Sequence, residues 1–343
     1  MANNVIYSKM VGSNDAMYGK FIHPIKMLIE SESNACEKNE PILKALFNME
    51  KSNRYSETVI GESDFDVFQS VTEGAGAEND SVGETFRKTI SHHTFMKEFT
   101  ITKEMADDSK IGIASDIKQK PAKFVRAYYK TRTKLACAAL IHGTEEQCTF
   151  AKSRIDLTTA DGLPLFNSAH KYANLEGTQS NYFKGDYTDA SKLEAALNKA
   201  ANKLRNFKDE NGEVMEYVAD TIIIPTNRPE FEAMVKKVVG SERTVGTNNN
   251  DINTQYGNWT VVVLPGWEST DDRFMIMSSD ANAQLSGSMF YNRVPLDINS
   301  WVDNHTRNLV WNGYCRMGIG FNTWKHMALV VPSTVTAGTP TTL

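Results

Sequence analysis

The sequence lacks the features that mark several large classes of protein. No apolar run approaches the ~20 residues of a membrane-spanning helix, and the first 20 residues have no basic segment followed by an apolar core, so no secretory signal is predicted. Only four cysteines occur in 343 residues, at positions 36, 137, 148 and 315, with no CxxC pair and no zinc-like Cys/His spacing. We therefore expect reduced thiols, a cytosolic setting and no membrane partner.

Signatures of enzymes are also missing. There is no GxxxxGK[ST] loop, no GxGxxG at a strand-to-helix turn and no GxSxG motif. His92 and His93 are adjacent, and on a strand they would point to opposite faces, so a shared metal ion is not expected. Asp161 and His170 could form an acid/base pair, although a structural role in their loop is the favoured interpretation. We predict no enzyme, no catalytic residue, no metal and no cofactor; a cytosolic enzyme using Asp161, His170 or His92 is the alternative.

What the chain does have is the composition of a packed globular protein, with 41% hydrophobic and 23% charged residues. Its length suggests two or three structural units. The net charge of −5 argues against a uniform coat of nucleic acid. The charge is unevenly distributed, however. Residues 116–143 hold seven basic residues and one acidic residue, and no acidic residue occurs from 117 to 144.

This basic segment predicts the clearest helix of the chain. Ser115 or Asp116 can cap it, Pro121 falls early in it, and Gly143 ends it, for a length of about 40 Å at ~1.5 Å per residue. Two interpretations of its charge stay open: a solvated outer face, or a surface for an anionic partner, with nucleic acid contacted through phosphates. The basic residues are Lys118, Lys120, Lys123, Arg126, Lys130, Arg132 and Lys134.

The remaining segments predict a mixed fold. Residues 1–50 are expected to be an irregular arm followed by a short helix from Pro41. Residues 51–101 predict a long β-hairpin, with strands at 55–60, 66–71 and 86–101 and a glycine-rich tip, which must rest on the domain itself or on a neighbouring subunit. After a loop-rich stretch, the later elements are a helix at 189–207, a strand at 220–225, a helix capped by Asn227 and ending near Gly240, strands at 259–264, 274–277, 308–321 and 327–331, and a frayed tail at 332–343.

This order of parts resembles the major capsid protein of tailed bacteriophages (Caudoviricetes), which has the Hong Kong ninety-seven fold. The local likeness is best in the second half of the chain, and residues 161–170 are similar to a segment of the Mu-like major head subunits. The similar segments are ADTIIIPTNRPEFEAMV at 219–235, NWTVVVLP at 258–265, RFMIM at 273–277 with Ser279-Asp280, NHTRNLVWNGYCRMGIGF at 304–321, HMALVV at 326–331 and DGLPLFNSAH at 161–170.

The resemblance implies an α+β fold with named parts. By it, the long basic helix is the spine helix of the peripheral P-domain, and the hairpin is the E-loop that lies over a neighbouring subunit. The implied parts are an N-terminal arm at 1–50, the E-loop at 51–101, the P-domain at 102–188 with its spine helix at 116–143, the α/β A-domain at 189–303, P-domain return strands at 304–331 and a C-terminal tail at 332–343.

The resemblance also implies a function. The chain would be a structural protein that self-assembles into pentamers and hexamers of an icosahedral virion shell, built in the host cytoplasm and enclosing double-stranded DNA. The seven basic residues would face the DNA and contact its phosphates. A separate scaffold protein and a portal are implied partners, with a decoration protein as a further candidate. An encapsulin-like protein nanocompartment is the alternative.

The resemblance assigns the E-loop an inter-subunit role. Some relatives cross-link an E-loop lysine to a neighbour's asparagine; Lys88 lies in the E-loop, but no segment matches the partner asparagine or a catalytic acid. The residues implied in inter-subunit contact are Phe65, Phe68, Val71, Gly74, Gly76, Phe86 and Lys88.

Overall fold

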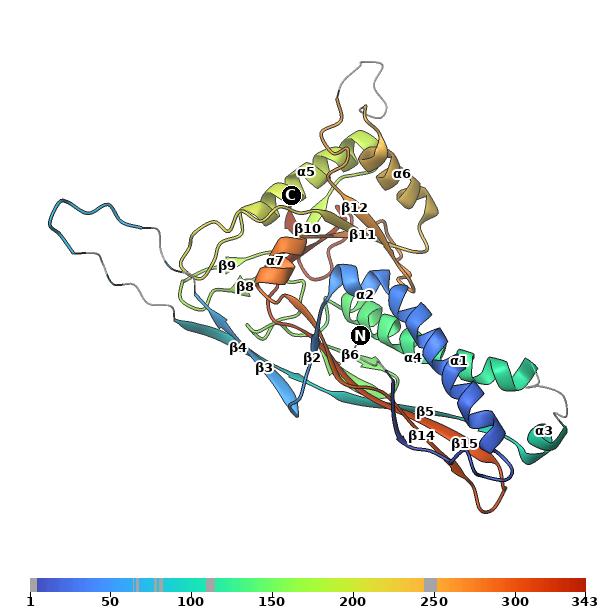
Figure 1. Cartoon of the computed structure of the whole chain (residues 1–343). Helices are drawn as coiled ribbons and strands as arrows, with labels where there is room; N and C mark the ends of the chain where they lie inside the picture. Colours follow the sequence, from blue (N-terminus) through green and yellow to red (C-terminus); the bar gives the residue numbers. More distant parts are fainter. Residues whose placement is uncertain are drawn as a thin grey trace.

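Two β-sheets and the helices packed on them organise the chain (Figure 1). The computed structural model describes residues 5–63, 65, 68–76, 79, 83–108, 115–243 and 252–343. One unit is elongated around a five-stranded sheet, the second is built on a six-stranded sheet, and a thin β-hairpin projects from the region between them. Among the described helices, none combines the length and the apolarity needed to cross a bilayer.

The five-stranded sheet forms the elongated unit. Its central pair is a long antiparallel ladder in which Ser288 faces Phe321 at one end and Val302 faces Leu309 at the other. The strand order is β1-β14-β15-β5, with β2 also paired to β14. The strands are β1 (Val5–Lys9), β2 (Asn48–Lys51), β5 (His93–Ile101), β14 (Ser288–Val302) and β15 (Leu309–Phe321). The sequence analysis predicts no strand at β14 and places its residues in the A-domain at 189–303. Because β14 pairs with β15 in the five-stranded sheet, the end of the predicted A-domain is corrected.

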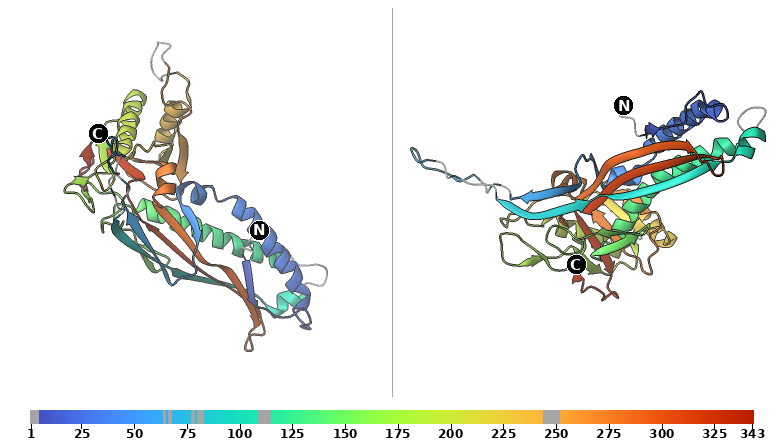
Figure 2. Two further views of the ribbon diagram at one scale, coloured as in Figure 1. Left: turned by 60° about the vertical axis from the view of Figure 1, so that its left-hand side comes forward. Right: turned by 90° about the horizontal axis from the view of Figure 1, so that it is seen from below.

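Helix α4 (Ser115–Ile141) runs along this sheet, and α1 (Gly19–Lys38) packs beside it (Figures 1 and 2). α4 begins and ends within two residues of the predicted helix at 116–143. The prediction of an irregular arm is wrong for α1, because Phe21, Ile22, Ile25 and Ile29 recur at helical spacing and are buried. The shorter helices are α2 (Pro41–Leu46) and α3 (Lys103–Asp108).

The six-stranded sheet carries the second unit. Its order is β12-β11-β13-β16-β10-β17, and β11 pairs in parallel with β12 and antiparallel with β13. Asp189 caps the first helix of this unit by accepting a hydrogen bond from the Lys192 amide. The elements are β10 (Tyr182–Gly185), α5 (Ala190–Arg205), β11 (Thr221–Pro225), α6 (Pro229–Gly240), β12 (Thr260–Leu264), β13 (Phe274–Met277), α7 (Ser279–Gln284), β16 (Met327–Pro332) and β17 (Thr341–Thr342).

Three predictions for this unit are corrected. Asn227 does not cap α6; its side chain exchanges hydrogen bonds with the backbone of Ser269 instead. The resemblance implies that both closing strands, within 304–331, return to the P-domain. In the structure, only β15 joins the five-stranded sheet. β16 is almost completely buried and lies in the middle of the other sheet, as a continuous apolar run favours. The tail is not frayed at its end, since β17 pairs with β10 and the Leu343 amide donates to the Lys184 carbonyl.

The projecting hairpin consists of β3 (Ser56–Glu62) and β4 (Glu84–Ser91), which pair only with each other (Figures 1 and 2). The single strand predicted over 86–101 is interrupted at His92, because β4 pairs with β3 whereas β5 pairs with β15. Of the strand predicted at 66–71, residues 66–67 lie outside the described residues and 68–71 form no strand. Two small hairpins complete the fold: β6 (Gln147–Phe150) with β7 (Ser153–Asp156), and β8 (His170–Lys171) with β9 (Thr178–Gln179).

Candidate assembly and nucleic-acid surfaces

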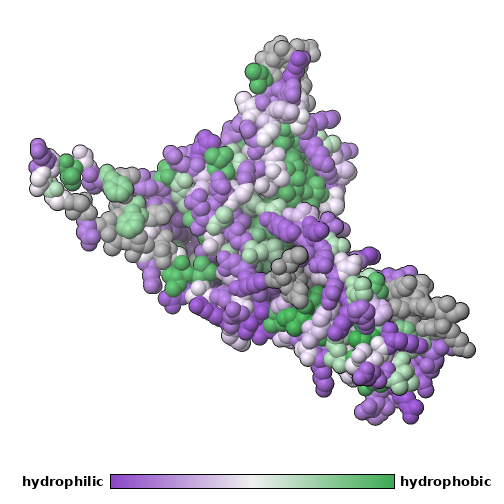
Figure 3. Space-filling model, viewed as in Figure 1, coloured by the Kyte–Doolittle hydropathy of each residue, from purple (hydrophilic) through white to green (hydrophobic). Residues whose placement is uncertain are grey.

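The segment predicted to be the E-loop, residues 51–101, exposes large apolar side chains far from either core. Phe65 is 66% exposed, Phe68 is fully exposed and Val71 is 53% exposed. Figure 3 shows apolar surface along this projection, remote from the body. Gly74 has a φ of +87°, a left-handed conformation that glycine adopts without strain, and Gly76 is also exposed. Burying one phenylalanine stabilises a structure by roughly 2–3 kcal/mol. A partner surface that covers these side chains would therefore gain a substantial free energy of binding.

Two of the residues predicted for E-loop contact face inward instead. Residues of β4 alternate, so that Lys88 and Ile90 are buried while Arg87 and Thr89 are exposed. Phe86 is half-buried and lines a cavity. The Lys88 ammonium donates to Asp156 Oδ2 at 2.6 Å and to Thr158 Oγ1 at 2.7 Å within the same chain. Lys88 is therefore corrected from an inter-subunit residue to an internal one.

Four of the seven basic residues on α4 share one exposed face. Lys123, Arg126, Lys130 and Lys134 are exposed and follow each other at intervals of three, four and four residues, which is the spacing of one helix face. We call these four residues the basic stripe. Arg126 forms an ion pair with Glu32 of α1, so one of the four positive charges is already partly compensated.

The other three basic residues are not counted in the basic stripe, for different reasons. The Lys120 ammonium donates to the Thr100 carbonyl at 2.9 Å and is turned toward the end of β5. The side chain of Lys118 lies outside the described residues. Arg132 is buried, 3.3 Å from the Glu40 carboxylate, and its guanidinium lies about 5.5 Å from the centres of the Tyr128, Tyr129 and Phe290 rings. The prediction that Arg132 faces DNA is corrected for this reason.

Asp161 and His170 do come together, as a buried structural pair. His170 Nδ1 lies 2.7 Å from Asp161 Oδ2, and the imidazole stacks on Trp324 with ring centres 4.5 Å apart. Burial raises the pKa of Asp161, but hydrogen bonds from His170, Thr159 and the Leu163 amide outweigh it and hold the pKa below its usual value. No hydroxyl or thiol of the described residues hydrogen-bonds His170 Nε2, so the pair has no nucleophile to activate.

The remaining candidate of the alternative enzyme interpretation, His92, lies at the base of the hairpin. His92 Nε2 lies 2.9 Å from the Ser52 hydroxyl, which also donates to Glu57 at 2.6 Å. Burial lowers the pKa of His92, and the nearby Arg316 lowers it further, which favours the neutral imidazole. Among the residues that the structure describes, no group of three or more His, Cys, Asp and Glu side chains could hold a metal ion.

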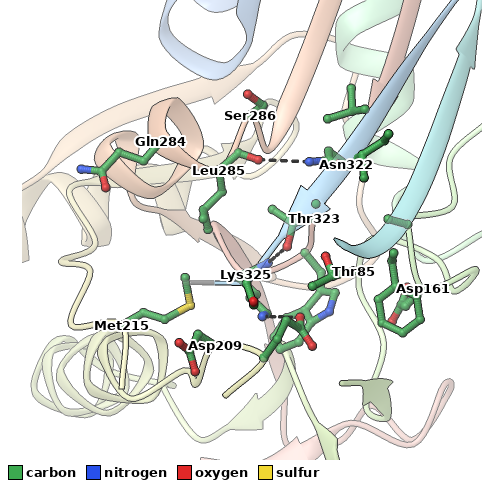
Figure 4. A pocket seen from close by; sticks show the side chains of 18 of the residues that line it. Thr85, Asp161, Asp209, Met215, Gln284, Leu285, Ser286, Asn322, Thr323 and Lys325 are labelled. Atoms are coloured by element: carbon green, nitrogen blue, oxygen red, sulfur yellow. Dashed lines mark hydrogen bonds and ion pairs between the residues drawn. The ribbon is translucent and has the colours of Figure 1, made fainter. Parts of the chain in front are cut away.

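A cavity of about 340 Å³ lies where the hairpin meets both units, and the sequence gives no signal for it (Figure 4). Thr85 of β4 borders it on one side, and the end of α7 borders it on another. Asn322 donates to the Leu285 carbonyl at 3.2 Å across its rim, and Lys325 pairs with Glu210 at 2.6 Å. These two pairs join segments that are distant in sequence around the cavity, and residues of the hairpin line the same space.

Comparison with known proteins assigns the class. Residues 87–331, well over half of the chain, match the profile of a family described as phage capsid protein. The chain therefore belongs to the phage capsid protein family. It is a structural component of a bacteriophage capsid and not an enzyme, so these sequence predictions are confirmed.

Solved structures from phages and a GTA particle align with most of the chain at low identity. A chain of Mycobacterium phage Patience shows 13% identity and a TM-score of 0.49, with 94% of this chain and 89% of that chain covered. The capsid of an empty GTA particle shows 12% identity and a TM-score of 0.49, covering 85% and 90%. The capsid of cyanophage P-SCSP1u shows 9% identity and a TM-score of 0.49, covering 86% and 88%. No curated protein matches the sequence.

Proposed function

We propose that the chain is the major capsid protein of a tailed double-stranded DNA bacteriophage, assembling in the host cytoplasm into the pentamers and hexamers of an icosahedral shell. The observation that carries this proposal is the E-loop, which holds Phe65, Phe68 and Val71 in solvent beyond the end of the two-stranded ribbon of β3 and β4. An isolated ribbon with an apolar tip is poorly stable in water. A neighbouring subunit that covers the tip removes this cost.

The shape of the subunit favours ring closure. The E-loop tip and the surface that would receive it are different parts of the same chain, so the contact is heterologous. Repeated heterologous contacts close into a ring when the rotation between copies allows it and otherwise form an open filament. Several weak contacts per subunit then act together through their high effective concentration. Closed rings are therefore the expected building blocks, and the resemblance to tailed-phage capsid proteins implies five and six copies in each ring.

Electron microscopy of the purified protein tests the assembly. The native chain should give rings or closed shells, whereas Phe65→Ser with Phe68→Ser should leave mostly single subunits with unchanged thermal stability. Tyr55→Ser is the matched control, because Tyr55 is 84% exposed but lies outside the tip, before β3. Persistent single subunits of the native chain under all assembly conditions would contradict the proposed function.

The basic stripe supports a DNA-facing role for α4. Three of its charges, on Lys123, Lys130 and Lys134, have no ion-pair partner among the described residues. A row of unpaired cations on one helix face raises the local concentration of an anionic partner, and a regular row of charges fits backbone phosphates better than base edges. We propose that this face lies toward the lumen of the shell.

Charge reversal tests this orientation. Lys123→Glu, Arg126→Glu and Lys130→Glu together should reduce the fraction of DNA-filled heads without preventing shell formation. The matched control reverses two lysines and one arginine on α5, namely Lys199, Lys203 and Arg205, all of which are exposed. If both triple variants give normally filled heads, or both fail equally, the specific role of the basic stripe is refuted.

Further partners complete the proposal. A separate scaffold protein and a portal would act with this chain during assembly, and a decoration protein could bind the finished shell. The likeness of residues 161–170 to Mu-like head subunits supports a place near that group. Co-expression of the chain with genes neighbouring its own tests these partners: shells of uniform diameter should form only when the scaffold is present.

A further inference from the structure

The inner side of β4 joins the projecting hairpin to the subunit through one ionic cluster. The Lys88 side chain is only 7% exposed, and its ammonium bonds both Asp156 and Thr158 in the segment that ends and follows β7. We call these three residues the latch. The hydroxyl of Thr158 accepts a hydrogen bond from Lys88 and donates one to Asp156 Oδ1 at 2.7 Å. Each of the three side chains is therefore hydrogen-bonded to the other two.

The carboxylate in the latch is held in a fixed orientation. Its Oδ2 accepts from Lys88, while its Oδ1 accepts from both the amide and the hydroxyl of Thr158. Burial raises the pKa of Asp156, but the hydrogen bonds from Lys88 and Thr158 outweigh it and lower the pKa overall. The carboxylate is therefore ionised at neutral pH, and the bond from Lys88 is charge-assisted and directional.

A second, apolar contact lies two residues further along β4. Ile90 packs with Met289 and Tyr291 in a small cluster separate from the main core. A Cβ at Gly320 would come within 2.8 Å of Ile90, so the glycine lets this side chain sit against the sheet. Apolar contact holds the strand close to the body but does not define its direction. The latch supplies that direction.

The hairpin is attached to the subunit at one end only, so a further contact is needed to fix its direction. β3 and β4 pair only with each other, and the ladder changes partner at His92, where β5 begins. A two-stranded ribbon with one junction can pivot about that junction. Lys88 lies four residues before the junction, on the inner side of the ribbon, where a bond to the body limits the pivot.

We propose that Lys88 is a positioning residue for shell assembly: through the latch it fixes the direction in which the E-loop leaves the subunit, and with it the geometry of the contact between copies. This inference rests on the proposed assembly function. The E-loop tip lies far from its root (Figures 1 and 2), so a small change in angle at the latch displaces the tip by a much larger distance.

Hydrogen exchange on unassembled subunits tests the latch directly. Lys88→Met keeps most of the apolar stem and removes the charge; the β3–β4 amides should then exchange roughly 10- to 100-fold faster, the range expected when a hydrogen bond to a charged group is lost. Arg87→Met is the matched control, because the neighbouring Arg87 is exposed and its ion pair among the described residues is with the exposed Glu84. Lys88→Arg should restore most of the protection, since it returns the charge.

Electron microscopy of the same variants provides the second measurement. Lys88→Met should give shells or rings of mixed diameter, while Arg87→Met and Lys88→Arg give the native distribution. Native exchange in the hairpin of Lys88→Met, or a uniform rise in exchange across the whole subunit with native shells, would overturn the proposal. Faster exchange confined to the hairpin together with absent shells in the native chain would retain the latch and reject the proposed function.

Discussion

Replacing Arg132 with methionine separates the two roles that its position on α4 allows. On the basic stripe, the substitution would weaken contacts with DNA and leave the subunit stable. In the structure, however, the Arg132 and Glu40 side chains are only 3% and 2% exposed, and the guanidinium lies among three aromatic rings. The substitution leaves a buried carboxylate without its ion-pair partner.

The size of the effect follows from this burial. Breaking a buried ion pair by removing one partner costs about 3–5 kcal/mol, because the remaining charge stays away from water. At ~2.1 cal/mol/K per residue, the unfolding entropy of a chain of this length converts that loss to a fall of roughly 4–7 °C in the unfolding midpoint. Burial already raises the pKa of Glu40 although Arg132 opposes the change, so Glu40 should take up a proton in the variant.

Thermal unfolding of the unassembled subunit is the assay. Arg132→Met should lower the midpoint, and Arg132→Met combined with Glu40→Leu should recover more than half of the loss, because no unpaired charge remains. Lys130→Met, two positions away on the exposed stripe, should leave the midpoint nearly unchanged. A native midpoint for Arg132→Met, accompanied by the same loss of DNA retention as Lys130→Met, would refute the buried role and restore Arg132 to the basic stripe.

Three further predictions concern other sites. The pKa of Asp161 is lowered in the folded chain, so its carboxylate stabilises the fold above the unfolded pKa of about 3.9, and this contribution is lost as pH falls through the folded value. Asp161→Asn should therefore reduce the dependence of the unfolding free energy on pH in the acid range, measured by urea unfolding. A thiol reagent should modify only Cys36 in the native subunit, because the other three cysteines are buried, and all four after unfolding. Glu32→Gln frees Arg126, so the salt dependence of DNA binding should steepen by about 0.9 in log–log slope; an unchanged slope would show that the ion pair is already open.

Much of the fold follows from periodicity that the sequence displays. α4 and the β11–α6–β12 succession were predicted closely, because each has a strong apolar pattern and a clear start or end. α1 was missed because Pro24 interrupts its second turn and its later part is polar. The partner of β16 could not be predicted either, since a short apolar strand does not indicate which of two sheets it joins.

The candidate surfaces were predictable only where they depend on local sequence. The exposed phenylalanines of the E-loop lie beside glycine and acidic residues that offer no core, so their exposure follows from the neighbourhood. The burial of Lys88 and of Arg132 depends instead on single carboxylates that are distant in sequence, and Asp156 lies 68 residues from Lys88. A charge run predicts net charge well, but it does not indicate which members find a partner inside.

The basic stripe of one subunit is expected to bind DNA weakly, as one contact among many. From Lys123 to Lys134 the helix rises about 17 Å at ~1.5 Å per residue, and three of the four cations have no ion pair within the part of the chain that the structure describes. Three phosphate contacts give a salt slope of only about −2.7, well short of the 6–10 contacts of a tight DNA-binding protein. A single subunit would therefore hold DNA weakly and without sequence preference. In the proposed shell, many identical stripes would act on one packaged genome, so a weak contact per subunit would be sufficient and would leave the DNA free to move during packaging and release.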